Sequence, residues 1–363
     1  MAPYLIIFFI LSVFSLLPFT KQCKDFKLPL LILSFLLLFL FAGLRENGVG
    51  TDDMAYVDKF LQIPDLSSWF SGEFTYSFSS VYMEPLYIFY GSFVRIFTDD
   101  YTALFASIAF LSVGFATYNY YQYSHYVFLT LLLFFVHTYL YRDINQIRSA
   151  VAAAIALFLI AQIHKKEHLK VWITLCLAGL FHMASLVLCF AYFSSFINVT
   201  RKRVIVAYLA SLLFGLIGLS HIIIQLIPGG GILARKLYSY TANERFLNAI
   251  SLFDITNIKN SLILFLIIFY WRKLERVVPY FTTLVLFYLL AVGVRIAFWD
   301  LGVLAARTST FFAIVEVILI PYFVFIFRNK VFVTLLIILY AFLTLYLNLF
   351  IKEGRSPYEL SIF

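Results

Sequence analysis

Apolar residues occur along this chain in runs of 12 to 27 residues, most of them between 15 and 20, separated by short polar or charged clusters. A helix needs about 20 apolar residues to cross the roughly 30 Å hydrocarbon core of a bilayer, so each run predicts a membrane segment. The runs lie near residues 3–19, 28–44, 85–98, 101–118, 126–141, 149–163, 171–197, 204–227, 260–271, 280–298, 309–327 and 331–350. The pattern predicts an all-α, polytopic integral membrane protein, a single transmembrane domain over residues 1–363 with about 12 to 14 membrane segments, some of them re-entrant or broken.

Basic clusters between the apolar runs predict how the chain is threaded, because cytoplasmic loops are enriched in Lys and Arg. These clusters lie at 21–27, 201–203, 272–276 and 328–330. Placing them in the cytoplasm leaves two long loops outside, an acidic loop at 45–83 and a second loop at 228–259.

The middle of the chain is less regular. The positive-inside rule also places Lys165 on the cytoplasmic side, whereas four simple membrane-spanning helices between residues 85 and 163 would place it on the outer side. We favour Lys165 on the cytoplasmic side, with 85–98 as a short re-entrant or broken segment. The segment 171–197 then runs outward and returns near His182. Irregular backbone of this kind is tolerated at membrane depth where protein or water covers it. Residues 142–148 then emerge outside. An arrangement of twelve simple spans instead places them inside.

Composition supports the membrane assignment and excludes a soluble domain. Of the 363 residues, 63% are hydrophobic and only 13% are charged, whereas soluble domains carry about 25% charged residues. The net charge of +8 comes from the clusters between apolar runs, so it indicates topology and no nucleic-acid partner. Cys23, Cys176 and Cys189 form no disulfide framework or metal-ligand spacing.

The first candidate site residues follow the second apolar run. Arg45 precedes the stretch 48–53 (Gly-Val-Gly-Thr-Asp-Asp), and Tyr56 comes shortly after it. One interpretation is a turn followed by a helix N-cap, because glycines permit tight turns and Thr and Asp cap helices. In the other, Arg45 faces an anionic ligand while Asp52 or Asp53 accepts a proton from a hydroxyl nucleophile.

Two further titratable residues stand at the edges of apolar runs or within them. Glu84 precedes Pro85, which is typical of a helix start, and the functional interpretation is a carboxylate aimed into an outward cavity. His182 lies inside a long apolar segment, where it either hydrogen-bonds a neighbour such as Ser185 or serves a function, since ionisable groups at membrane depth are costly.

The stretch 142–148 precedes an Ala-rich helix expected at 149–163. Asn145 and Arg148 are three residues apart and share a face if helical, whereas Gln146 points elsewhere. A positive charge at a helix N-terminus is unfavourable, and an anion bound there would relieve the mismatch.

The second half offers arginines and tyrosines as substrate-binding candidates. Arg295 and Arg307 flank a short outer loop and could clamp a diphosphate, because guanidinium matches phosphate oxygens in bidentate geometry. The alternative is that Arg295 simply pairs with Asp300. Tyr238 and Tyr240 lie in the long loop 228–259, where aromatic faces suit sugar rings.

Taken in order, several short motifs resemble the EpsG family, which groups with Wzy-type O-antigen and exopolysaccharide polymerases. The resemblance covers residues 40–190, with a looser match at Arg307. The motifs are Gly43-Leu44-Arg45, Gly50-Thr51-Asp52, Glu84-Pro85-Leu86-Tyr87, Asn145-Gln146-Ile147-Arg148 and Phe181-His182-Met183-Ala184-Ser185.

The resemblance implies a glycosyltransferase in the bacterial inner membrane, with an active site facing the periplasm. It implies that repeat units carried on undecaprenyl diphosphate are the substrates, and a chain-length regulator protein is a further candidate partner. The alternatives are a lipid-linked oligosaccharide flippase and a polysaccharide O-acyltransferase with His182 as base.

On this resemblance the candidate residues take catalytic roles. Arg45, Arg148 and Arg307 would neutralise the departing diphosphate, and His182 would orient or assist by hydrogen bonding. Asp52, or alternatively Glu84, would be the general base. No nucleotide motif or Asp-x-Asp pair is present, so we expect neither a cofactor nor a metal ion.

Overall fold

The computed structural model describes residues 1–17, 23–218, 251–351 and 356–361. Over these residues the chain is built from helices and carries no β-strand, only an isolated β-bridge between Arg45 and Leu360. The chain divides into two compact units. Unit 1 comprises residues 1–159, 169–186 and 317–363, and unit 2 comprises residues 160–168 and 187–316.

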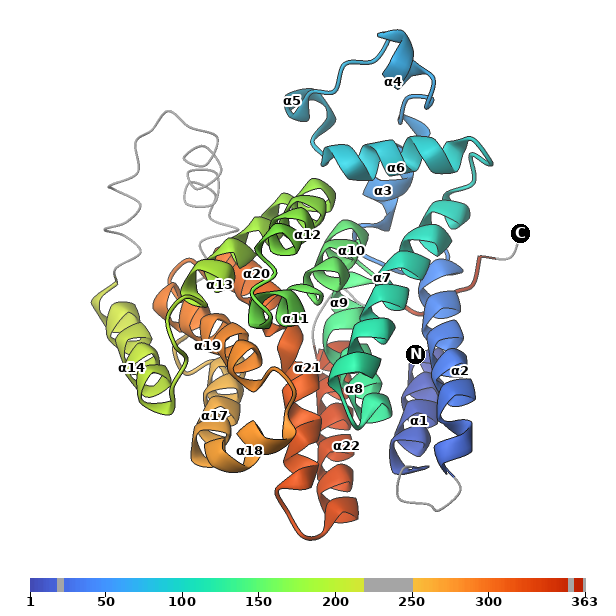
Figure 1. Cartoon of the computed structure of the whole chain (residues 1–363). Coiled ribbons are helices and arrows are strands. Elements are labelled where there is room, and N and C mark those ends of the chain that lie inside the picture. Colours follow the sequence, from blue (N-terminus) through green and yellow to red (C-terminus); the bar gives the residue numbers. More distant parts are fainter. Residues whose placement is uncertain (18–22, 219–250, 352–355, 362–363) are drawn as a thin grey trace. The chain divides into compact units, whose positions relative to one another are not determined.

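Unit 1 holds the N-terminal helices and the C-terminal helix (Figure 1). Its elements are α1 (Ala2–Leu16), α2 (Cys23–Gly43), α3 (Asp53–Leu61), α4 (Ser68–Ser71), α5 (Phe78–Val81), α6 (Pro85–Arg95), α7 (Tyr101–Tyr123), α8 (Val127–Phe134), the π-helical turn η2 (Phe135–Tyr139), α9 (Leu140–Arg142), α10 (Ile147–Ala156), most of α12 (His168–Phe181), the 3₁₀ helix η5 (Ile320–Phe325), α22 (Lys330–Tyr346) and the π-helical turn η6 (Leu347–Ile351).

Unit 2 is formed by the helices of the second half of the chain. They are α13 (Cys189–Ser194), α14 (Arg201–Ile217), α17 (Ile255–Phe269), α18 (Trp271–Val277), α19 (Phe281–Ala297), α20 (Gly302–Phe312) and the 3₁₀ turn η4 (Ala313–Val315). Three short elements cross the division between the units, namely α11 (Leu159–His164), the 3₁₀ helix η3 (Met183–Leu188) and α21 (Glu316–Leu319).

The predicted fold class is confirmed. Five helical stretches of the described chain are long and apolar enough to cross a membrane, and several shorter apolar helices accompany them. The long stretches are Phe26–Gly43, Tyr101–Tyr123, Ile147–His164, Gly302–Phe325 and Lys330–Ile351. Large apolar side chains on several of these helices face outward, as a lipid-facing surface requires.

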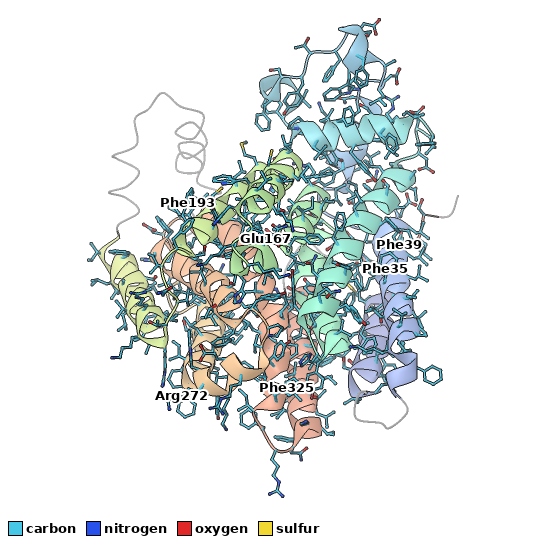
Figure 2. All side chains as sticks on the ribbon, viewed as in Figure 1. Phe35, Phe39, Glu167, Phe193, Arg272 and Phe325 are labelled. Atoms are coloured by element: carbon cyan, nitrogen blue, oxygen red, sulfur yellow. The ribbon has the colours of Figure 1, made fainter. Side chains whose placement is uncertain are left out.

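Close packing of α2 on α7 forms one wall of unit 1. Gly43 lies so near α7 that a Cβ at this position would stand 2.8 Å from the Cα of Ala106. Further along α2, the rings of Phe35 and Phe39 stack at 5.8 Å, and each meets Phe110 of α7 edge-on (Figure 2). Small residues where helices approach and interlocking aromatic rings elsewhere are typical of helix packing in membranes.

Two segments depart from regular spans, in the places where the sequence predicts it. The helix α6 has 11 residues, so it extends only about 17 Å, and it runs across the end of α7 instead of alongside it (Figure 1). The helical run that starts with α12 is interrupted at His182, and a Cβ on Gly179 would lie 2.6 Å from Cδ2 of Leu186. The chain therefore folds back at the histidine.

The C-terminal segment closes over the end of α2. The backbone N–H of Glu46 donates to the carbonyl of Glu359, and the N–H of Ser361 donates to the carbonyl of Leu44. The ring of Tyr358 stacks on Phe41 at 3.9 Å and its hydroxyl donates to the Phe41 carbonyl at 3.0 Å. These contacts fix the turn in which Arg45 lies.

Substitution of Gly43 by Ala should lower the stability of the protein, because the added methyl group meets backbone and forces α2 away from α7. We expect a loss of about 1–3 kcal/mol, measured by thermal unfolding in detergent. Gly114→Ala is the matched control, since a Cβ there meets only the Phe35 ring at 3.7 Å. The control should be neutral or stabilising, and equal losses in both variants would contradict the packing argument.

Candidate functional site

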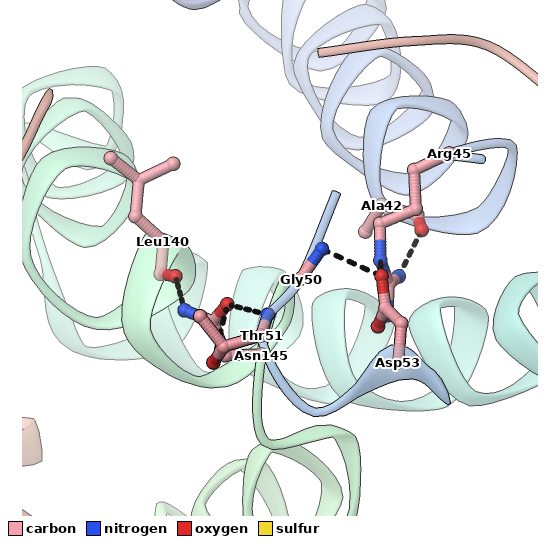
Figure 3. Close-up of polar contacts among 7 residues, drawn as sticks. All are labelled: Ala42, Arg45, Gly50, Thr51, Asp53, Leu140 and Asn145. Atoms are coloured by element: carbon pink, nitrogen blue, oxygen red, sulfur yellow. Dashed lines mark hydrogen bonds and ion pairs between the residues drawn. The ribbon is translucent and has the colours of Figure 1, made fainter. Parts of the chain in front are cut away.

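The turn after α2 is organised by a buried ion pair. Arg45 donates from Nε to Oδ2 of Asp53 at 3.1 Å and from Nη2 to Oδ1 at 2.7 Å, and neither side chain is exposed (Figure 3). Its third nitrogen donates to the carbonyl of Ala42, and the guanidinium lies 4.2 Å from the centre of the Phe105 ring. The Arg45 side chain is thus enclosed by protein on all sides.

The same turn is tied to the loop between α9 and α10. The N–H of Thr51 donates to Oδ1 of Asn145 at 2.9 Å, and Nδ2 of Asn145 donates to the carbonyl of Leu140 (Figure 3). Gly50 has its N–H bonded to Asp53, and a Cβ on it would overlap the carbonyl oxygen of Ile144. A glycine is therefore required for the turn to approach this loop.

Glu84 is the centre of the polar cluster next to this turn. Its Oε2 accepts from Nη1 of Arg148, while its Oε1 accepts from the N–H of Met183 at 3.1 Å and lies 3.2 Å from Nδ1 of His182. The three partners come from α10 and from the break after α12. We call Glu84, Arg148 and His182 the Glu84 cluster.

Two tyrosines line the arginine of this cluster. The guanidinium of Arg148 lies 5.6 Å from the centre of the Tyr56 ring and 5.8 Å from that of Tyr87. Both rings are buried, with 4% of Tyr56 and none of Tyr87 exposed. An aromatic face stabilises a nearby cation, so the tyrosines hold Arg148 in place while part of its side chain stays accessible.

The cluster contains an ionised carboxylate beside a neutral imidazole. Burial opposes ionisation of Glu84, but the hydrogen bond with His182 and the charge of Arg148 outweigh it and lower the pKa of the carboxyl to about 2. Burial also lowers the pKa of His182 below its ordinary value, although Glu84 acts in the opposite direction. At neutral pH the histidine is uncharged and retains one nitrogen lone pair.

Two further buried ionisable residues, Arg142 and Asp143, support the loop that carries Arg148. Arg142 is 1% exposed and donates to the carbonyl of Ser149 at 3.0 Å. The neighbouring Asp143 accepts from the hydroxyl of Ser112 at 2.6 Å, and burial raises the pKa of its carboxyl to about 7. Neither residue was predicted as part of the site. Their position inside the motif 142–148 is the sequence feature that could have identified them.

Most of the site residues predicted in the first half of the chain lie close together in unit 1, although some of them have partners that the sequence did not predict. Asp52 is half-buried and close enough to Tyr56 to influence it electrostatically, whereas Asp53 is the partner of Arg45. Gln146 occupies the N-cap position of α10, and its side-chain Nε2 donates to the hydroxyl of Tyr141.

The candidates of the second half lie in unit 2 or outside the described residues. Arg295 pairs with Asp254 at 3.0 Å and with Asn257 at 2.9 Å. Arg307 is exposed on α20. The predicted residues Tyr238 and Tyr240 fall outside the part of the chain that the structure describes. The roles of all four residues stay predictions.

Two hydrogen bonds bear on the two arrangements considered for the middle of the chain. In the arrangement of twelve simple spans, residues 45–83 and 142–148 are expected on opposite faces of the membrane. The bonds from Thr51 to Asn145 and from Arg148 to Glu84 instead join these segments within unit 1. They favour the arrangement in which α6 does not cross, and the topology stays a prediction.

Over the described residues, no group of three or more His, Cys, Asp or Glu side chains could hold a metal ion. The cluster instead offers a guanidinium for an anion and an imidazole that a carboxylate orients. Such a combination can stabilise negative charge and transfer a proton.

Fold and site together define a polytopic α-helical membrane protein whose candidate active site is a buried carboxylate that gathers an arginine and a histidine. The chain belongs to the EpsG family, whose model matches residues 28–360. It is similar to the amylovoran biosynthesis protein AmsC of Erwinia amylovora, with 25% identity over 343 residues, which cover 91% of this chain and 89% of that protein. No solved structure matches the chain.

Replacing Asp53 by Asn should destabilise the protein strongly, because it leaves the guanidinium of Arg45 buried without a counter-charge. Breaking a buried ion pair costs about 3–5 kcal/mol, which thermal unfolding of the purified protein in detergent would measure. Asp52→Asn is the matched control and should cost less than about 1 kcal/mol, since Asp52 is only half-buried. Equal destabilisation by both substitutions would contradict the assignment of Asp53 as the residue that compensates the charge of Arg45.

Proposed function

We propose that this protein is a polysaccharide polymerase of the bacterial inner membrane. It is a glycosyltransferase that joins repeat units carried on undecaprenyl diphosphate, with its active site facing the periplasm. The single observation that carries the proposal is the Glu84 cluster, an arginine and a neutral histidine held by one ionised carboxylate. Membership of the EpsG family and similarity to a protein named for amylovoran biosynthesis support it.

Arg148 is the residue proposed to bind the diphosphate. Its side chain is 19% exposed, whereas that of Arg45 is fully enclosed. When the bond between the anomeric carbon and the phosphate oxygen breaks, negative charge develops on the leaving diphosphate. A guanidinium next to that oxygen stabilises the charge. Arg45 takes a structural role in this scheme and holds the turn through Asp53.

His182 is proposed as the general base, with Glu84 as the residue that orients it. Glu84 already accepts hydrogen bonds from several donors, and its pKa of about 2 makes it a weak proton acceptor. If Nδ1 of His182 donates to Glu84, its Nε2 accepts the proton of the acceptor hydroxyl as the oxygen attacks the anomeric carbon. A carboxylate that orients the imidazole also stabilises the imidazolium that forms.

This scheme reassigns the base that the sequence predicts. Asp52 lies near Tyr56 and does not belong to the Glu84 cluster, so it is proposed to contact sugar hydroxyls together with Asn145 or Gln146. Arg295 and Arg307 stay predicted diphosphate-binding residues, and a chain-length regulator remains a proposed partner.

Deletion of the gene is expected to leave single repeat units attached to their acceptor. Gel analysis of lipopolysaccharide and of extracellular polysaccharide would detect the loss of the ladder of longer chains. Loss of a flippase would leave no repeat unit outside the cytoplasm, and loss of an acyltransferase would leave long chains without acyl groups. Either of these two results would contradict the proposal.

Arg148→Ala should reduce chain extension by about 100-fold or more, because the leaving diphosphate loses its counter-charge. Arg148→Lys should retain part of the activity, since it keeps the charge but not the planar guanidinium. Arg272→Ala, an exposed position on α18, is the control and should leave the ladder intact. Immunoblots of the membrane fraction would show equal amounts of protein. A normal ladder with Arg148→Ala would remove this residue from the mechanism.

The rate of extension should fall as the pH decreases through the pKa of His182, because the base works in its neutral form. Since burial lowers this pKa from 6.5, the midpoint of the loss should lie below pH 6.5. Glu84 raises the pKa of His182, so Glu84→Gln should move the midpoint to still lower pH besides slowing the reaction. The measurement is a pH profile in proteoliposomes. A midpoint that rises in Glu84→Gln would contradict the assignment.

A further inference from the structure

Tyr82 has an unusual backbone conformation beside the Glu84 cluster. It follows α5 with φ 58° and ψ 15°, in the left-handed region that residues with a side chain rarely adopt. It precedes Glu84 by two residues, and 74% of the residue is exposed. A large aromatic side chain is therefore held outward, next to the candidate active site, by a conformation that glycine would adopt at lower cost.

The segment before Tyr82 is firmly supported, so the exposed ring is not on a loose loop. The hydroxyl of Tyr76 donates to the carbonyl of Met83 at 2.8 Å. The ring of Trp69 is nearly parallel to that of Tyr76, at 6.5 Å and 14°, and its Nε1 donates to the hydroxyl of Ser92 at 2.9 Å. We use the name aromatic row for Trp69 and Tyr76, whose rings are in contact, together with Tyr82, which directly precedes Met83, the hydrogen-bond partner of Tyr76.

The composition of the segment indicates which kind of ligand the aromatic row suits. Residues 62–84 contain Asp65, Glu73 and Glu84 but no Lys or Arg, and they are rich in hydroxyl side chains. Anionic lipid headgroups and phosphates are held by basic clusters, which are missing here. Aromatic faces and hydroxyl groups instead match a neutral sugar, whose ring presents C–H bonds on its flat side and hydroxyls at its edge.

Tyr82 adopts its left-handed conformation as the C-cap of α5, with its N–H bonded to the carbonyl of Phe78, and strained residues of this kind cluster at ligand clamps and active sites. We propose that the aromatic row is a sugar-binding subsite of the Glu84 cluster, and that Tyr82 stacks on a sugar ring of the lipid-linked repeat unit to position its hydroxyl near His182. Tyr82 is thus a positioning residue. This inference rests on the proposed function and adds where the glycan part of the substrate binds.

Tyr82→Gly tests the role of the ring apart from the backbone, because glycine adopts the left-handed conformation without strain. In proteoliposomes with lipid-linked repeat units, we expect the KM of Tyr82→Gly to rise by about 5- to 10-fold with little change in kcat. Its melting temperature should be unchanged or higher. Tyr82→Phe should stay within about 2-fold of the unsubstituted protein, since it keeps the aromatic face. Phe70→Ala is the control, because Phe70 is 77% exposed on the same segment but does not belong to the aromatic row.

A direct binding measurement separates this inference from the proposed function. The probe is the free oligosaccharide released by mild acid from the cell's own lipid-linked intermediates, titrated against the purified protein while tryptophan fluorescence is recorded. Weaker binding in Tyr82→Gly supports the subsite. An unchanged KM and unchanged binding in Tyr82→Gly would overturn it, even when Arg148→Ala abolishes extension. Equal rises in KM for Phe70→Ala and Tyr82→Gly would also overturn it, because they would indicate contact with the bilayer surface.

Discussion

The carboxylate of Glu84 is the interaction on which the arrangement of the site depends. It stands at the start of α6 and accepts hydrogen bonds from Arg148 at the start of α10 and from the backbone of Met183, next to His182. Three segments that are far apart in the sequence therefore meet at two oxygen atoms. A buried carboxylate is stable only if its charge is compensated, so each partner is needed for the others to stay in place.

A second ion pair, between Arg45 and Asp53, shapes the turn next to this carboxylate. Arg45 and Asp53 are completely buried, and Arg45 donates two hydrogen bonds to the Asp53 carboxylate, which shapes the turn that meets Asn145. The C-terminal segment is hydrogen-bonded to the same turn through the backbones of Glu359 and Ser361. The enclosed pair fixes the geometry of the turn, and the partly accessible Glu84 cluster is the place where we propose that the reaction occurs.

Irregular helices make this arrangement possible in a protein of membrane spans. The π-helical turn η2 inserts an extra residue ahead of Arg142, and Asn348 donates to the carbonyl of Val136 within that turn at 2.8 Å. The break at His182 likewise frees the N–H of Met183 to bond Glu84. Interruptions of this kind are tolerated where side chains replace the missing backbone hydrogen bonds. The break at His182 lies at the Glu84 cluster itself.

Local hydrophobic patterns and the distribution of charge were enough to predict the helical membrane fold and the breaks near residues 85 and 182. They also identified a short list of polar residues near one end of the spans. The sequence did not determine which groups pair. Asp52 and Asp53 are adjacent and chemically identical, and only the packed turn makes Asp53 the partner of Arg45. The choice of Glu84 as the partner of Arg148, 64 residues away, likewise came from the tertiary structure. Side-chain pairing over such distances depends on which helix ends are brought together, and no local period in the sequence encodes it.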